Sequence, residues 1–279
     1  MNSHGIILYR SVLEVGQLKG NAFLFFPSAQ REFSPAYAIF AHGYTSHKGS
    51  LLNWGTRLAE KGIPTCLFDL PGHYLGGYHD VDHFEEFSAK AHHLFVAAKI
   101  EIEKILKDHY PLESDRFLDP ATKVSLILGG HSLGALLSLK AMSLAAFDPY
   151  PKMAIGVGFG QSYSKNNRTH LFETDFYQKT LEIRKQLVSP AIAPEFIFPW
   201  IKNEKNNLML TGQSIFLVTG EDDLVATPDR VQELAEYLRS QQNTVDVEIP
   251  QKLAHHLPEL AASYLMKFIK KKFPHLTHS

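Results

Sequence analysis

The sequence predicts an α/β protein with a mostly parallel, twisted sheet of about eight strands and helices on both faces. Short apolar runs alternate along the chain with longer amphipathic runs, which is the order of such a sheet. A length of 279 residues allows one large α/β domain or two small domains. No repeat of 20 to 50 residues and no low-complexity tract is found, which disfavours solenoids and linked arrays.

The expected elements follow from this alternation. Strands are expected at 6–9, 22–26, 36–41, 64–68, 124–128, 153–159, 215–219 and 245–249, the first two as an antiparallel pair at one edge. Helices, with apolar residues three and four positions apart, are expected at 51–61, 84–109, 133–146, 228–241 and 257–271.

The segment 161–212 interrupts the alternation. It is too long for an ordinary connection, and its aromatic content is too high for a solvated loop. We therefore expect a small helical cap at 161–212, inserted into a core formed by 1–160 and 213–279.

Composition excludes several classes. Lys+Arg 28 against Asp+Glu 29 gives a net charge of −1, so neither nucleic acid nor an anionic membrane is an expected partner. The single cysteine, Cys66, cannot form an intramolecular disulfide, which favours the cytoplasm. No signal peptide is expected, because residues 1–10 have no basic start followed by a long apolar run. No membrane span is expected, because no apolar run reaches about 18 residues.

The pattern Gly-x-Ser-x-Gly stands between an expected strand and an expected helix, at Gly130-His131-Ser132-Leu133-Gly134. A serine at such a turn takes strained dihedral angles and projects its hydroxyl above the sheet, while the glycines let the turn close. The adjacent helix N-terminus favours developing negative charge. Ser132 is therefore the expected nucleophile, with the backbone N–H of Leu133 beside it as an oxyanion donor.

A serine nucleophile needs a histidine base and a carboxylate that orients it. Acids follow the strand expected at 215–219, with Asp222 and Asp223 as the candidates. His255 and His256 follow the last strand, which completes the chain order serine, acid, histidine. The residues alone leave both pairs open.

These motifs, with His42-Gly43-Tyr44 and Asp69-Leu70-Pro71-Gly72-His73, resemble those of the α/β-hydrolase superfamily of serine hydrolases, of the esterase and lipase kind. The resemblance implies that fold over essentially the whole chain. It selects Asp223, third after a glycine, and His256, which precedes Leu257-Pro258. It also places the second oxyanion donor on the backbone of Tyr44. The chain departs from the family where a glycine usually precedes the histidine.

The expected function is hydrolysis of carboxylic esters or thioesters of small to medium apolar acyl groups through an acyl-enzyme. The aromatic residues Phe172, Phe176, Tyr177 and Trp200 are expected to line the acyl pocket. An anionic substrate is less expected, although Arg168 or Arg184 would reverse this. The alternatives are a peptidase or amidase, an acyltransferase of the same fold, or a binding module without turnover.

The partner expected is a small-molecule acyl ester, and no cofactor or metal is expected. The histidines and acids of 73–83 fit a solvated loop better than a metal site, because that stretch has no cysteine and no helical pair of ligands. The sequence leaves the oligomeric state open.

Overall fold

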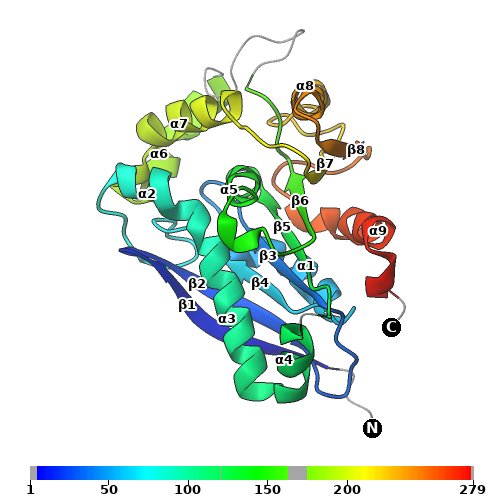
Figure 1. Ribbon diagram of the computed structural model, residues 1–279. Helices are drawn as coiled ribbons and strands as arrows, with labels where there is room; N and C mark the ends of the chain where they lie inside the picture. The colour runs from blue at the N-terminus through cyan, green and yellow to red at the C-terminus, as the bar shows by residue number, and fades with distance from the viewer. Residues whose placement is uncertain (1–4, 120, 163–174, 278–279) are drawn as a thin grey trace.

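A computed structural model describes residues 5–119, 121–162 and 175–277. The described chain forms one eight-stranded sheet in the order β1-β2-β4-β3-β5-β6-β7-β8 (Figure 1). The strands are β1 (Ile6–Val15), β2 (Leu18–Pro27), β3 (Ala36–Ala41), β4 (Thr65–Phe68), β5 (Ser125–His131), β6 (Lys152–Val157), β7 (Ser214–Val218) and β8 (Thr244–Glu248). All eight expected strands are therefore found.

The sheet is parallel from β4 to β8, whereas β1 and β2 pair antiparallel at one edge and β2 is antiparallel to β4. This confirms the predicted fold class. Strand β5 extends to His131, three residues beyond the expected end, because Gly129 and Gly130 continue its ladder with β3 and β6. The sequence predicts an end at Leu128 because glycine is a poor strand former and the apolar run stops there.

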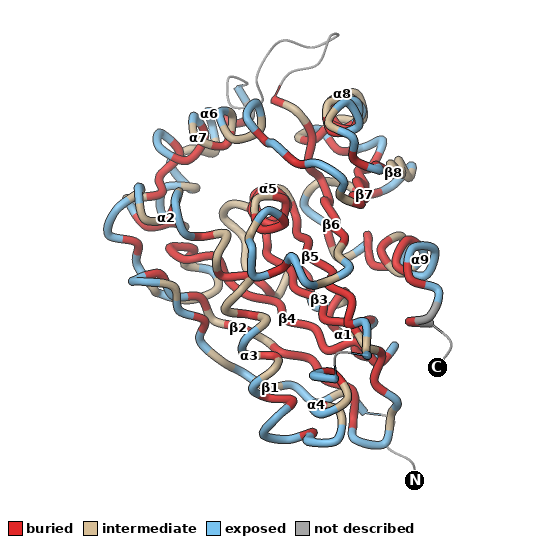
Figure 2. The backbone as a smooth tube through the Cα atoms, viewed as in Figure 1, coloured by how far each residue is buried: buried red, intermediate tan, exposed pale blue. Residues whose placement is uncertain are grey.

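Helices cover both faces of the sheet. Helices α1 (Leu52–Ala59) and α9 (Ala262–Lys272) pack on one face, and α3 (Leu94–His109), α5 (Leu133–Ala141) and α8 (Pro228–Ser240) pack on the other. A cluster of buried apolar side chains lies between the sheet and the helices on each face. The ring of Phe216 in β7 stacks on that of Phe268 in α9 on one face, and Phe68 of β4 packs edge-on against Phe95 of α3 on the other. Figure 2 shows the central strands buried and the outer sides of the helices exposed.

Two helices depart from expectation. The helix expected at 84–109 is divided into α2 (Phe84–Lys90) and α3 by a 3₁₀ turn at Ala91–His93. An unexpected helix, α4 (Pro111–Leu118), follows directly. Tyr110 has non-helical dihedral angles (φ −137°, ψ 61°) because the residue before a proline disfavours the helical region, and Pro111 then begins the next helix.

The described part of 161–212 lies between β6 and β7 and contains α6 (Asp175–Gln186), a 3₁₀ turn at Pro190–Ile192 and α7 (Pro194–Asn206). In Figure 1 these helices lie beyond one end of the sheet, near α2 and α5. Trp200 of α7 packs edge-on against Phe84 and Phe87 of α2. Lys140 of α5 forms an ion pair with Glu204 of α7. The aromatic content of α7 thus attaches this segment to the rest of the protein.

Within the described ranges, no helix combines the length and the apolar character that a membrane crossing requires.

Candidate active site

Ser132 occupies the sharp turn between β5 and α5. Its dihedral angles are φ 50° and ψ −110°, which is left-handed backbone for a residue with a side chain. Its backbone N–H donates to Val157 O of β6 at 2.9 Å, which ties the turn to the neighbouring strand. Strain of this kind, roughly 1–3 kcal/mol, persists only where the surrounding structure enforces it. The expected position of Ser132 above the sheet is therefore the observed one.

The two glycines of the motif allow this turn to close. A Cβ on Gly130 would lie 2.5 Å from the backbone carbonyl carbon of Gly134, and a Cβ on Gly134 would collide with the backbone of Ala41 and His42. Helix α5 therefore approaches both β5 and the loop after β3 only because these positions lack side chains.

Asp223 is buried, with 2% of its surface exposed, and its carboxylate is fixed by hydrogen bonds. Oδ1 accepts from the backbone N–H groups of Val225 and Ala226, both at 2.8 Å. Oδ2 accepts from Thr219 Oγ1 at 3.2 Å and contacts His255 Nδ1 at 2.9 Å. A carboxylate in this position holds Nδ1–H of the imidazole and leaves Nε2 as the proton acceptor.

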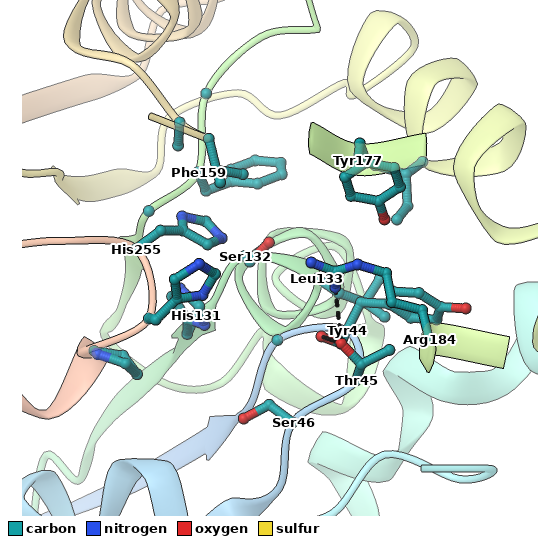
Figure 3. A pocket seen from close by; sticks show the side chains of 18 of the residues that line it. Tyr44, Thr45, Ser46, His131, Ser132, Leu133, Phe159, Tyr177, Arg184 and His255 are labelled. Carbon is teal, nitrogen blue, oxygen red and sulfur yellow. Dashed lines mark hydrogen bonds between the residues drawn. The ribbon is translucent and has the colours of Figure 1, made fainter. Parts of the chain in front are cut away.

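The structure pairs Asp223 with His255, and the predicted pairing with His256 is wrong. The side chain of His255 is 11% exposed and points toward Ser132 (Figure 3), whereas His256 is exposed at the rim of the pocket. Both histidines lie in a turn in which Leu257 N donates to Ala254 O at 2.9 Å, and their rings are nearly perpendicular, with centroids 5.9 Å apart. Partial burial and the neighbouring His255 lower the pKa of His256.

Asp222 has a different role from Asp223. Its Oδ1 accepts from the backbone N–H of Leu253 at 2.8 Å and so joins the loop after β7 to the loop that carries His255. The expected preference for Asp223 over Asp222 as the partner of a histidine therefore matches the geometry.

The loop after β3 lies against Ser132. A Cβ on Gly43 would come within 3.3 Å of Ser132 Cβ and 2.6 Å of His131 Nδ1, so glycine is required for this approach. His42 supports the loop: its Nδ1–H donates to Gly43 O at 2.7 Å, and Nε2 accepts from Leu70 N–H at 2.9 Å. Burial lowers the pKa of His42 to about 3, which keeps the ring neutral in this role.

The expected oxyanion donors flank Ser132. Leu133 is the first residue of α5, where backbone N–H groups have no partner inside the helix. Tyr44 lines the same pocket, and its hydroxyl donates to Ile192 O at 3.0 Å. The Tyr44 side chain thus attaches the loop to the 161–212 segment.

A cavity of about 370 Å³ opens at Ser132 and is lined by His255, Leu133 and Tyr44 among others. Its apolar lining includes Phe159, Tyr177, Ile183, Leu187 and Ile201. Tyr177 is therefore where the sequence predicted it.

The other predicted pocket residues are not placed there. Trp200 is absent from the described lining because it packs against α2. Phe172 and the side chain of Phe176 lie outside the described residues.

Several charged or titratable lining residues were not assigned to the pocket from sequence. His131, the middle residue between Gly130 and Ser132, is buried with its ring centroid 4.5 Å from that of His255, and burial holds its pKa well below the usual value. Arg184, Lys205 and Arg230 add positive charge. Arg184 was named from sequence only as a residue that would favour an anionic substrate. Arg230 had a positional signal, because it lies in the first turn of the helix that follows the loop of Asp223.

No set of three or more His, Cys, Asp or Glu side chains suited to a metal ion occurs among the described residues.

A strand, a glycine-flanked serine turn and a helix, with an Asp–His pair on later loops, define the α/β-hydrolase class of fold and site. The sequence profile of the Alpha/beta hydrolase family matches residues 38–263. The chain belongs to this family. A search of curated proteins gives no significant match.

Solved structures show the same fold at low identity. An esterase of Pyrococcus furiosus is 20% identical, with a TM-score of 0.56 and coverage of 95% of this chain and 93% of that chain. A serine hydrolase of Xanthomonas campestris, described as lacking a lid, is 16% identical, with a TM-score of 0.55 and coverage of 96% and 95%. A cold-adapted esterase from an Arctic intertidal metagenomic library is 16% identical, with a TM-score of 0.52 and coverage of 95% and 94%.

Proposed function

We propose that the protein is a serine hydrolase that cleaves carboxylic esters or thioesters through an acyl-enzyme. The observation that carries this proposal is the Asp223–His255 hydrogen bond of 2.9 Å, with the imidazole directed toward Ser132 on its strained turn. The esterase names of two solved relatives agree with it.

In this proposal Ser132 Oγ attacks the acyl carbonyl and gives its proton to His255 Nε2. The oxyanion that forms is stabilised by the N–H groups of Leu133 and Tyr44. His255 then transfers the proton to the leaving alcohol or thiol. Water, activated by the same nitrogen, cleaves the acyl-enzyme and restores the serine. Asp223 holds Nδ1–H and stabilises the imidazolium during both steps.

We also propose that 161–212 is a cap over the site. Three contacts support this: Tyr44 donates to Ile192 O, Arg184 donates to Thr45 Oγ1 at 2.9 Å, and Ser189 N donates to Gly72 O at 2.8 Å. The cap closes one side of the cavity with Tyr177 and Ile183. The apolar walls fit small to medium acyl groups, and the lone buried cysteine, Cys66, fits a cytoplasmic protein.

A fluorophosphonate probe tests the nucleophile directly. The wild-type protein should be labelled at Ser132 and should hydrolyse p-nitrophenyl butyrate. Ser132→Ala should lose labelling, and its turnover rate should fall by about 10⁴-fold or more. Removal of one member of a serine–histidine–aspartate set typically lowers the rate by that factor.

Ser143→Ala is the matched control, since Ser143 is exposed just after α5. It should leave labelling and turnover unchanged. A correctly folded Ser132→Ala protein that keeps more than about a tenth of the activity would disprove the assignment.

A further inference from the structure

The described lining of the cavity beside Ser132 holds three basic residues, Arg184, Lys205 and Arg230, and no Asp or Glu. Arg230 has a further interaction of its own, so the positive charge available to a ligand is that of Arg184 and Lys205. Arg184 and Lys205 are partly buried. Partly buried basic side chains are normally accompanied by carboxylates, because an uncompensated charge is costly to remove from water. This lining therefore suits a ligand that brings negative charge.

Arg184 of α6 is held by neutral groups. Its Nε donates to Thr180 Oγ1 at 3.1 Å and its Nη1 to Thr45 Oγ1 at 2.9 Å, and the guanidinium lies 4.7 Å from the Tyr177 ring centroid. Figure 3 shows the guanidinium beside the Tyr44–Thr45 loop, extended toward the side of the pocket that holds Ser132. These contacts fix its direction and leave its charge without a carboxylate partner among the described residues.

Lys205 of α7 lies on another side of the cavity, with Nζ 4.9 Å from the ring centroid of Phe159. The acid next to it in sequence, Glu204, is paired with Lys140. Burial and the nearby Arg230 lower the pKa of Lys205 to about 7. An anion in the cavity would relieve this repulsion.

The position of Arg230 is set by the backbone around it. Gln161 N donates to Arg230 O at 2.9 Å, and a Cβ on Gly160 would come within 2.8 Å of the Arg230 carbonyl carbon. The start of α8 is thus fixed against the end of the segment that follows β6. Basic groups from α6, α7 and α8 therefore line one cavity.

Building on the esterase function proposed above, we propose that the substrate is an ester that also carries a carboxylate or phosphate group, with Arg184 as its main ligand and Lys205 as a second. This replaces the expectation of a wholly neutral acyl ester. A guanidinium binds either anion through paired N–H donors, which makes it more selective than an ammonium group.

Matched substrates test the proposal. On the acyl side, mono-p-nitrophenyl adipate is compared with its methyl ester, and on the alcohol side, O-butyryl glycolate with its methyl ester. For at least one pair, the wild type should prefer the anionic ester in kcat/KM by roughly 10- to 100-fold, as expected for a charge-assisted hydrogen bond. Adipate, inorganic phosphate and ethyl phosphate, as competitive inhibitors of p-nitrophenyl butyrate hydrolysis, distinguish a carboxylate site from a phosphate site.

Arg184→Gln should reduce the preference to within about three-fold, and Arg184→Lys should retain part of it because the charge remains. The readout is the ratio between paired esters, so a general loss of activity from a disturbed loop does not affect it. Lys179→Gln, an exposed cation on the same helix, should leave the ratio unchanged. Equal rates for both esters in both pairs, or an unchanged ratio in Arg184→Gln, would overturn the proposal.

The failure of the esterase function is distinguishable from this outcome. A protein that neither reacts with fluorophosphonate nor cleaves any ester disproves that function. Calorimetric titration of Ser132→Ala with monomethyl adipate and with dimethyl adipate then measures anion binding without turnover. Binding of the anionic compound alone, weakened by Arg184→Gln, would support the anion site, and equal or absent binding would overturn it.

Discussion

The two walls of the pocket hold their polar side chains differently. On the wall formed by the loops after β7 and β8, Asp223 accepts four hydrogen bonds, one of them from His255. On the wall formed by α6 and α7, Arg184 and Lys205 contact hydroxyls and aromatic rings among the described residues. The first wall is complete without a ligand, and the second has charges that a ligand would balance.

The two walls therefore suit two different tasks, proton transfer and discrimination between substrates. A proton relay requires partners fixed within a fraction of an ångström, and backbone N–H groups at sheet ends provide that rigidity. Discrimination between substrates requires polar groups that are satisfied by one ligand and left unpaired by another. In the reaction proposed above, the loops at the sheet ends would supply the proton relay and the inserted segment would supply the discrimination between substrates.

The largest expected effect comes from the first wall, which carries Asp223 and His255. His255→Ala should lower kcat for p-nitrophenyl butyrate by roughly 10³- to 10⁵-fold, because no other imidazole among the described residues is held by Asp223. His256→Ala should lower it by less than about ten-fold, since His256 is exposed at the rim. Circular dichroism checks that both variants fold. The opposite ranking would return the base to His256, as the sequence motif predicted.

A smaller effect is expected at the loop beside Ser132. Gly43→Ala should lower kcat by roughly 10²- to 10³-fold, because its Cβ would push the loop from Ser132 and misplace the Tyr44 N–H. Tyr44→Phe keeps that N–H and loses only the hydrogen bond to Ile192 O, so about a two- to five-fold decrease is expected. If Tyr44→Phe were the more damaging change, the phenol rather than the backbone would act in the reaction.

The edge of the sheet at which the first wall lies could be predicted from the sequence, because the topology of a parallel sheet determines it. Ser132 and Asp223 each follow a buried strand, and parallel strands bring their carboxyl ends to one edge. The choice between His255 and His256 failed because both follow the same strand. The local turn from Ala254 to Leu257, rather than the strand order, decides which side chain faces inward.

The second wall could not be read in the same way. The spacing of apolar residues predicts which side of α7 is buried, but not which other element packs against that side. Trp200 was therefore expected in the pocket, although it packs on α2. For the same reason Lys205, at the far end of that helix, gave no signal. Its place in the pocket depends on the tertiary position of α7.

The last prediction concerns the stability of the second wall. The pKa of Lys205 is lowered to about 7 in the folded protein, while an unfolded lysine titrates near 10.4. Between these values the unfolded chain binds more protons, so this group makes the free energy of unfolding rise with pH across roughly pH 7 to 10. Below pH 7 the folded protein carries the full penalty of the buried charge.

Lys205→Met should therefore raise Tm at pH 6 by about 2–6 °C, and the gain should shrink toward pH 10. Arg230 faces the ammonium and accounts for part of the penalty, while Glu204 is occupied by Lys140. Lys179→Met, at an exposed position, should shift Tm little at either pH. A Lys205→Met protein that is less stable at pH 6 would show that the ammonium is already compensated in the folded protein. In that case Arg184 alone, and not Lys205, would distinguish the second wall from the first as a charge that a ligand would balance.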